Sequence, residues 1–243
     1  MSSFLARLAL QLPLISAVDR PRPWSQDCAL CLAAAGERLV CRACEADLQG
    51  IGRPCKGCAL PLPAGGACAT CRRRPYAFDT AVACFEYRFP IDRLVQRFKY
   101  AGDLALGRWL ALCLAERVRG LPRPDLLLAP PLAPERLRER GFNQAVELAR
   151  TLGRELGVRQ DVSALHRERS TKPQAGLGRR ERQANLRGAF ACRRSLKDLH
   201  VAIVDDVMTT GATADTLARV LKARGAARVS VWAVARATDP PRR

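Results

Sequence analysis

The chain has 243 residues, of which 48% are hydrophobic, enough for one large domain or for two unequal ones. Its 41 basic and 23 acidic residues give a formal net charge of +18, which favours contact with polyanions through their phosphates. Its 2 histidines argue against catalysis by a histidine proton relay, and its 11 cysteines are too unevenly spread for a disulfide scaffold.

Residues 1–27 are predicted to form an N-terminal extension. Its apolar stretch, residues 4–17, is interrupted by Arg7 and Gln11, lacks a basic region before it and is too short to span a bilayer. We interpret this stretch as a short helix that packs on the body of the protein. Together with the cysteine pattern, it indicates a reducing, cytoplasmic setting and no membrane span.

Segment 28–71 carries four C-x-x-C pairs. Each pair places two thiolates on one tight turn, and a tetrahedral Zn²⁺ needs two such turns. Without a histidine ligand or an open position, the pairs predict a double zinc ribbon with two structural zinc ions; disulfides or a redox role are the alternatives. The near-repeat favours sequential pairing and leaves interleaved pairing open. The predicted ligands are Cys28, Cys31, Cys41 and Cys44 at one ion, and Cys55, Cys58, Cys68 and Cys71 at the other.

After a basic hinge at residues 72–75, apolar strands alternate with amphipathic helices. Strands are predicted over residues 77–87 and 126–129, and helices from Pro90 and again up to about Val118. Such alternation is typical of an α/β fold with a parallel sheet. The three remaining cysteines, Cys84, Cys113 and Cys192, fall in apolar surroundings and are predicted to be core residues.

A basic segment follows the strand at 126–129. Arginines at 136, 138 and 140 lie in what we predict to be a loop, and a helix is predicted from about Asn143 to Gly157. The ends of neighbouring parallel strands meet at one edge of a sheet, so these arginines can face a ligand bound at the next strand. A solvated basic loop is the alternative.

The stretch 201–213 predicts the ligand site. Residues 201–204 form a continuous apolar run typical of a buried parallel strand, and a helix is predicted from about Ala212. Between them, Gly211 permits close backbone approach, and the N-terminus of the helix would face an anion. Asp205 and Asp206 can accept hydrogen bonds from a ribose diol, or hold a Mg²⁺ that neutralises a diphosphate. The acid pair of a P-loop hydrolase is the rival interpretation, but the chain has no Gly-Lys dipeptide.

These thirteen residues, four hydrophobics, two acids and a Thr-Thr-Gly-x-Thr loop, resemble the phosphoribosyl-diphosphate (PRPP) motif of type I phosphoribosyltransferases. The resemblance implies a type I phosphoribosyltransferase-like parallel sheet flanked by helices over residues 76–243. It also implies Mg²⁺ bound with PRPP and catalytic roles for Asp205 and Asp206. The PRPP-binding residues that we expect are Asp205, Asp206, Met208, Thr209, Thr210, Gly211, Ala212, Thr213 and Arg140.

Further motifs, together with the double zinc ribbon, are similar to the ComF family over residues 28 to about 236. They are Arg140-Gly141-Phe142-Asn143-Gln144 after a Pro-Pro-Leu strand end, Phe98-Lys99-Tyr100, Gly102-Asp103, Gln174 and Arg182-x-x-Asn185. This resemblance implies a PRPP-binding protein that serves DNA uptake in natural transformation, with single-stranded DNA and DNA-uptake proteins as partners. The alternatives are an active phosphoribosyltransferase with an unidentified acceptor and a PRPP-sensing regulator.

The polar segment between residues 165 and 189 is predicted to be a lid or a disordered segment. The resemblance to type I phosphoribosyltransferases implies a lid that closes over the ligand and excludes water. Its Lys172, Arg179, Arg180 and Arg182 are candidates to reach phosphates. A last strand is predicted over residues 229–234, and residues 239–243 are predicted to be frayed.

Overall fold

We analysed the fold in a computed structural model, which describes residues 26–62, 68–73, 75–169 and 188–238. The predicted N-terminal helix, the four basic residues of the predicted lid and the predicted frayed end lie outside the described residues.

A parallel sheet of five strands forms the centre of the fold, in the order β1-β7-β6-β2-β3. The apolar strand residues that the sequence indicates pair in register, with Val204 of β6 opposite Trp232 of β7 and Ile203 of β6 opposite Leu128 of β2. The predicted neighbourhood of the strand ends at 128 and 204 is therefore confirmed. The strands are β1 (Thr80–Glu86), β2 (Leu126–Leu128), β3 (Arg159–Gln160), β6 (His200–Met208) and β7 (Arg228–Arg236), with a separate antiparallel pair of β4 (Leu165–Arg167) and β5 (Phe190–Cys192).

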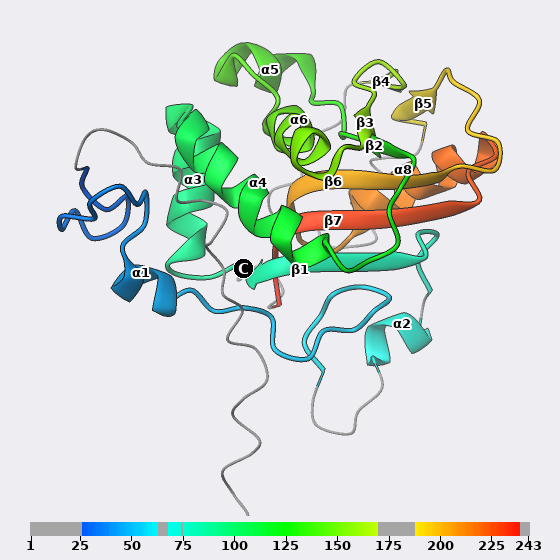
Figure 1. Ribbon diagram of the computed structural model, residues 1–243. Helices are drawn as coiled ribbons and strands as arrows, with labels where there is room; N and C mark the ends of the chain where they lie inside the picture. The colour runs from blue at the N-terminus through cyan, green and yellow to red at the C-terminus, as the bar shows by residue number, and fades with distance from the viewer. Residues whose placement is uncertain (1–25, 63–67, 74, 170–187, 239–243) are drawn as a thin grey trace, which may run out of the picture.

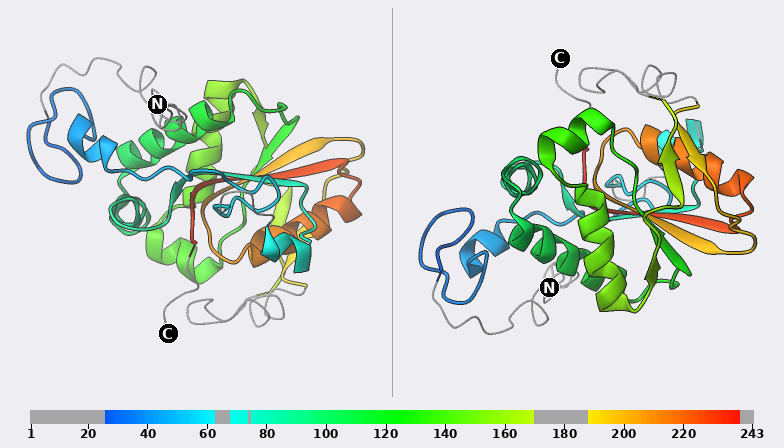
Figure 2. Two further views of the ribbon diagram at one scale, coloured as in Figure 1. Left: turned by 90° about the horizontal axis from the view of Figure 1, so that it is seen from below. Right: turned by 90° about the horizontal axis from the view of Figure 1, so that it is seen from above.

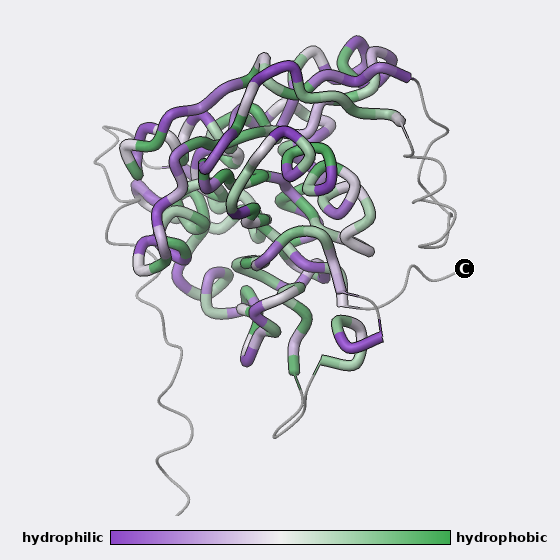
Figure 3. The backbone as a smooth tube through the Cα atoms, turned by 90° about the vertical axis from the view of Figure 1, so that its right-hand side faces the viewer, coloured by the Kyte–Doolittle hydropathy of each residue, from purple (hydrophilic) through white to green (hydrophobic). Residues whose placement is uncertain are grey.

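Helices cover both faces of the sheet (Figures 1 and 2). Helices α4 (Leu104–Val118) and α6 (Gln144–Leu156) pack on one face, with α3 (Ile91–Ala101) against α4, and α8 (Ala212–Ala223) packs on the other. The apolar faces that the sequence predicts are the buried ones: Phe98 on α3, Leu148 on α6 and Leu217 on α8 have no exposed surface. Hydrophobic segments accordingly run through the middle of the molecule (Figure 3).

Local capping sets the helix ends. The side chain of Asp103 accepts a hydrogen bond from the Leu106 N–H at the start of α4, and the Asn143 side chain accepts one from the Ala145 N–H at the start of α6. Gly102 after α3 and Gly157 after α6 adopt the left-handed conformation that ends a helix. These residues explain why the predicted boundaries lie close to the observed ones.

Two features differ from the sequence-based expectation. The segment predicted as a basic loop contains a helix, α5 (Pro134–Arg140), because Pro134 favours a first helical position, Glu135 is an acidic residue in the first turn, and Gly141 at φ 75° ends the helix. Strand β6 also continues to Met208, so Asp205 and Asp206 lie within the strand and not after it.

The cysteine-rich segment packs against α3 and against the outer edge of the sheet. Near α1 (Arg42–Ala46), Ala29 accepts a hydrogen bond from the Arg97 guanidinium of α3 at 3.2 Å. Residues 49–56 run along the outer edge of β1, where the Ala81 N–H donates to the Lys56 carbonyl at 3.0 Å. This contact covers part of an edge strand that would otherwise expose unpaired backbone groups. Helix α2 (Ala69–Arg73) completes this segment.

Among the described residues, none of the helices combines the length and the apolar composition needed to cross a membrane.

Candidate functional site

A cleft of about 420 Å³ opens where β2 and β6 end, and we call it the ligand cleft. Such a size suits a small-molecule ligand, and the carboxyl ends of parallel strands are the usual place for one. The residues that line it come from α3, the segment after β2, β6, the loop before α8 and the β4–β5 pair. They include Lys99, Pro130, Arg136, Arg140, Asn143, Gln144, Arg167, Phe190, Asp205, Asp206, Thr209 and Thr213.

Asp206 forms a buried ion pair at the floor of the ligand cleft. Its Oδ2 lies 2.9 Å from the Nζ of Lys99, and their side chains are only 5% and 17% exposed. Although burial opposes it, the charge of Asp206 raises the pKa of Lys99, so the amine stays protonated. The sequence pointed to Lys99 only as part of a family motif; its contact with Asp206 joins α3 to β6 and could not be read from the chain.

Asp205 lies beside this pair and is half-buried. Burial and the negative charge of Asp206 raise the pKa of Asp205 well above that of a free carboxyl group. Its Oδ1 accepts a hydrogen bond from the Asp206 N–H at 2.9 Å, which fixes the side chain near the carboxyl end of β6. Asp205 and Asp206 thus form an adjacent pair of acidic side chains, with Lys99 of α3 as the counter-charge of Asp206. A ligand hydroxyl group or a cation can take the place of that lysine.

The loop of residues 209–213 connects β6 to α8, and we call it the phosphate loop. Of the residues predicted to bind PRPP here, Thr209 and Thr213 line the cleft. Thr210 instead supports the loop: its Oγ1 accepts the Ala212 N–H at 3.3 Å, and its carbonyl accepts the Tyr76 hydroxyl at 3.0 Å. The start of α8 leaves unsatisfied N–H groups, which is a favourable end for an anion.

Met208 at the end of β6 and Gly211 and Ala212 within the loop are buried, and none of them lines the cleft. Gly211 has φ 75°, and a Cβ there would lie 2.8 Å from Met208 Cε and 2.9 Å from Tyr76 Cε1. Only glycine fits both the backbone conformation and the space. The structure thus divides the residues predicted to bind PRPP into those that face the cleft and those that shape the loop.

Arginines form the opposite side of the ligand cleft. Arg140 lies 4.9 Å from the Tyr100 ring centroid, and its Nη2 donates to the Tyr100 hydroxyl at 3.4 Å. Arg136 comes from the same helix and Arg167 from β4, and all three line the cleft. Burial and the nearby charge of Arg136 lower the pKa of Arg167, because a neighbouring like charge disfavours the charged form.

Three buried polar atoms in the ligand cleft make no hydrogen bond to the described residues: Arg140 Nε, Gln144 Oε1 and Asp206 Oδ2, the last of which has only its ion pair with Lys99. A buried donor or acceptor left without a hydrogen bond costs roughly 1–3 kcal/mol.

Arg236, which sequence analysis did not single out, is 2% exposed and supports the phosphate loop from below. Its guanidinium donates to the carbonyls of Met208 at 2.9 Å and of Thr209. Its Nε donates to the carbonyl of Cys58 at 2.9 Å, across 178 residues of sequence. One buried side chain thus joins the end of β7, the phosphate loop and the cysteine-rich segment.

The eight cysteines of the predicted ribbon form two groups of four, each with its Sγ atoms within 4.8 Å of one another. The Sγ–Sγ distances are 3.8 Å for Cys31–Cys41, 3.8 Å for Cys55–Cys71 and 3.5 Å for Cys58–Cys68. Tetrahedral zinc with Zn–S bonds of about 2.3 Å places its sulfurs about 3.8 Å apart, so either group could hold a metal ion. The first cluster is Cys28, Cys31, Cys41 and Cys44, and the second cluster is Cys55, Cys58, Cys68 and Cys71, which is the sequential grouping.

Backbone N–H groups point at the sulfurs of the first cluster. Cys28 Sγ accepts the N–H groups of Leu30 at 3.4 Å and Cys41 at 3.3 Å. Although burial opposes it, these hydrogen bonds lower the pKa of Cys28 and favour the thiolate that a metal needs. By contrast, Cys84 is buried in the core, where burial raises its pKa to about 12.

No model of a known protein family matches the chain. Among solved structures, similarity extends to a purine phosphoribosyltransferase from Pyrococcus horikoshii, with 21% identity over 52% of this chain and 79% of that chain, at a TM-score of 0.34. A glutamine PRPP amidotransferase from Bacillus subtilis gives 17% identity over 56% of this chain and 26% of that chain, at a TM-score of 0.37.

Curated relatives match over most of their length. DNA utilization protein YhgH of Escherichia coli is 35% identical over 214 residues, which are 84% of this chain and 92% of the relative. Competence protein F of Haemophilus influenzae is 31% identical, over 82% of this chain and 90% of the relative. Competence protein ComFC of Streptococcus pneumoniae is 24% identical over similar shares, 85% and 92%. This chain therefore belongs to the ComF family.

Proposed function

We propose that this protein binds PRPP together with Mg²⁺ in the ligand cleft, and that this binding serves the uptake or use of DNA. The observation that carries the proposal is the convergence of three chemistries on one cleft: two carboxylates, a hydroxyl-rich loop at a helix N-terminus, and three arginines. PRPP is a sugar with a phosphate at one end and a diphosphate at the other, so it requires all three.

Each part of the ligand has a matching group. Asp205 and Asp206 accept hydrogen bonds from the ribose hydroxyls and stand where Mg²⁺ would neutralise the diphosphate. The phosphate loop and the N-terminus of α8 hold the 5-phosphate. Arg136, Arg140 and Arg167 face the diphosphate, and an anion among them relieves the repulsion between their charges.

Lys99 supplies a counter-charge in the cleft. Its amine compensates the buried carboxylate of Asp206. When the sugar hydroxyls and Mg²⁺ arrive, the lysine is free to turn toward the diphosphate. The same two acids are the residues that we propose for catalysis, should transfer occur.

The two cysteine clusters are proposed to hold one structural Zn²⁺ each. Sulfur-only ligands and the absence of a histidine or carboxylate among them support a closed, structural site and not a catalytic one. We accordingly propose that the chain is divided into an extension at 1–27, a double zinc ribbon at 28–71 and a phosphoribosyltransferase-like domain at 76–243.

The link to DNA rests on the names of the relatives and on charge. Relatives that share a third of their residues are named for DNA utilization and for competence. The net charge of +18 supports single-stranded DNA as a partner, alongside other DNA-uptake proteins, in a reducing cytoplasmic compartment.

A calorimetric titration of PRPP with Mg²⁺ into metal-replete protein tests the ligand. We expect saturable binding that is lost in Asp205→Ala/Asp206→Ala and weakened about tenfold or more in Arg140→Ala, because a charge-assisted contact to phosphate is removed. Arg138→Ala is the matched control: it lies on the same helix, its side chain is 78% exposed, and it does not line the cleft.

No binding to the wild-type protein at millimolar PRPP, or equal losses for Arg140→Ala and Arg138→Ala, would contradict the assignment. Repeating the titration with a single-stranded oligonucleotide already bound asks whether DNA changes the affinity for PRPP. A change in either direction would couple the cleft to DNA.

One observation favours active phosphoribosyl transfer as a second candidate function. Phe190 lines the same cleft as the two acids, and the Arg167 guanidinium lies 5.4 Å from the centroid of its ring. A flat apolar surface beside the sugar site suits a planar acceptor such as a nucleobase. Release of diphosphate from PRPP in the presence of individual nucleobases, lost in Phe190→Ala, would support transfer over simple binding or sensing.

A further inference from the structure

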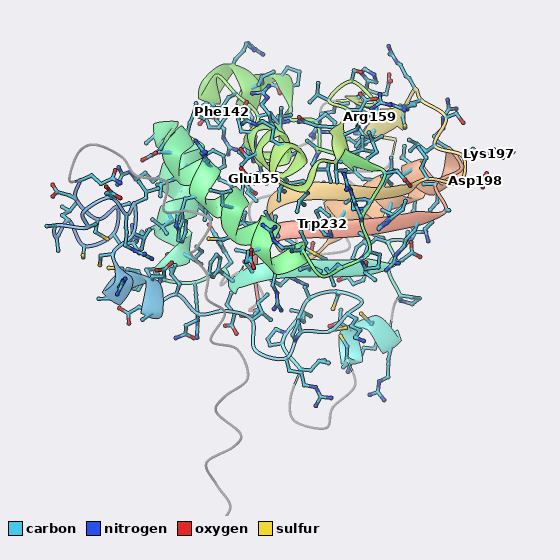
Figure 4. All side chains as sticks on the ribbon, viewed as in Figure 1. Phe142, Glu155, Arg159, Lys197, Asp198 and Trp232 are labelled. Atoms are coloured by element: carbon cyan, nitrogen blue, oxygen red, sulfur yellow. The ribbon has the colours of Figure 1, made fainter. Side chains whose placement is uncertain are left out.

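A second cavity, of about 390 Å³, lies at the amino ends of β1 and β7, at the other end of the strands from the ligand cleft. We call it the edge cavity. Its floor is apolar and includes Val82 and Trp232, which pair across β1 and β7, and Leu121 closes it from the segment after α4. Figure 4 shows Trp232 on β7, near the end of α4.

Three cations surround this apolar floor: Lys56 from the cysteine-rich segment, Arg117 from the last turn of α4, and Arg228 at the start of β7. None of the three side chains forms an ion pair or hydrogen bond with a described residue, and no carboxylate lines the cavity. The nearby Asp79 is already engaged, by the Lys222 amine at 2.8 Å and the Val229 N–H at 2.7 Å. The cavity is therefore complementary to an anion.

A chain of hydrogen bonds fixes the Thr80 hydroxyl, a polar group that also lines the edge cavity. His200 Nδ1 lies 3.3 Å from the Arg123 carbonyl, which can only accept, so Nδ1 carries the proton and Nε2 is an acceptor. The Ser230 hydroxyl then donates to Nε2 at 2.8 Å, and the Thr80 hydroxyl donates to Ser230 at 3.0 Å. The Thr80 oxygen is left as an acceptor at the cavity, suited to an N–H group of a ligand.

We propose that the edge cavity is a second binding site and that it takes a nucleotide. The base would lie on the apolar floor with an amino or ring N–H group donating to Thr80, and the phosphate would lie among the three cations. A sugar phosphate would leave the apolar floor uncovered, and a neutral apolar ligand would leave the cations without a counter-ion. This proposal goes beyond PRPP binding and does not depend on it.

The nucleotide can be free or part of a single strand, and two probes separate these sources. We would titrate deoxyadenosine monophosphate and, separately, a twelve-residue oligodeoxyadenylate into the full-length, metal-replete protein. Two variants test the site: Val82→Phe fills the cavity from an edge strand, and Arg117→Ala removes one cation. Arg119→Ala is the matched control, because it follows the same helix and pairs with Glu116 outside the cavity.

We expect nucleotide affinity to fall about tenfold or more in Val82→Phe and in Arg117→Ala and to stay unchanged in Arg119→Ala. Binding of the monophosphate identifies a free nucleotide as sufficient, and binding of the oligonucleotide alone identifies a unit of a single strand; either supports the site.

Three results would overturn the proposal. They are no binding of either probe to the wild type, wild-type affinity in both Val82→Phe and Arg117→Ala with their folds intact by circular dichroism, and displacement of the nucleotide by PRPP. PRPP titrations of the same variants should be unaffected. If PRPP fails to bind even the wild type, PRPP binding is refuted while the nucleotide titration remains interpretable.

Discussion

The ion pair between Lys99 and Asp206 joins α3 to β6 within the ligand cleft, and both side chains are largely shielded from water. Removing one partner of such a pair leaves the other charge buried without compensation. We therefore expect Lys99→Met to lower the free energy of unfolding by about 3 kcal/mol, measured by urea denaturation at neutral pH.

The control for this prediction is the double variant Lys99→Met/Asp206→Asn. Since it leaves no uncompensated charge, it should be more stable than Lys99→Met alone. Equal or lower stability of the double variant would mean that the two groups are not coupled and that the ion pair has no structural role.

Asp79 directly precedes β1 and contacts both α8 and β7. These contacts predict that the free energy of unfolding depends on pH. Although burial opposes it, the hydrogen bonds from the Lys222 amine and the Val229 N–H lower the pKa of Asp79. A carboxyl group with a lowered folded-state pKa contributes stability above its unfolded pKa, and that contribution disappears as the pH falls through the folded pKa.

Asp79→Asn should therefore destabilise the protein at pH 7 by less than about 1 kcal/mol, because the pair is more than a third exposed and screened by water. At about pH 2 the wild type and the variant should unfold at the same urea concentration. A difference that persists at acid pH would show that the carboxylate charge is not the cause.

Residues such as Lys99 and Arg236 mark the limit of what the sequence could predict. Asp205, Asp206 and the phosphate loop lie in one continuous stretch, so their pattern is visible along the chain. Arg236 acts on Met208 from 28 residues away and on Cys58 from 178 residues away, contacts that depend on how the strands are ordered. Its position at the end of an apolar strand gave no signal of that role.

At the scale of elements, Gly211 determines whether the phosphate loop can form between β6 and α8. Alanine there would be strained at φ 75°, and its Cβ would also meet Met208 and Tyr76. We expect Gly211→Ala to lower the free energy of unfolding by about 2 kcal/mol or more, the sum of backbone strain and overpacking, and to weaken PRPP binding.

Gly141 offers a matched control, since it has the same φ of 75° but no atom within 4 Å of the point that a Cβ would occupy. Gly141→Ala should carry only the backbone strain, roughly 1 kcal/mol. The difference between the two variants in urea denaturation therefore measures the contact beneath the loop. Equal losses would mean that Met208 and Tyr76 move aside without cost.

The elements themselves were largely predictable, because each carries its own periodicity and its own caps. Helix α6 lies between the capping residues Asn143 and Gly157, as its sequence indicates. Helix α5 was missed because most of its seven residues are charged and none of them is buried. Its sequence therefore shows no apolar face. Strand order was only partly inferable, from the expectation that the two strand ends meet.

At the level of the whole molecule, Arg236 links the second cysteine cluster to the phosphate loop of the ligand cleft. Cys58 offers its carbonyl to Arg236, which also holds the carbonyls of Met208 and Thr209. The first cluster packs instead beside α3 and α4, and among the described residues it has no such contact with the phosphate loop. Metal in the second cluster is thus expected to stabilise the loop, while metal in the first is not.

Hydrogen exchange of a peptide that covers residues 209–213 tests this difference without any ligand. Cys58→Ser should release one metal ion per chain and speed exchange in the phosphate loop, because the carbonyl that anchors Arg236 loses its fixed position. Cys31→Ser should release one metal ion as well, with exchange in the loop unchanged. Arg236→Lys should speed exchange with both metal ions retained, since lysine lacks the fork that reaches several carbonyls. If Cys58→Ser loses its metal and the loop exchanges as in the wild type, the second cluster does not support the ligand cleft, and the buried arginine acts on the loop independently of the metal.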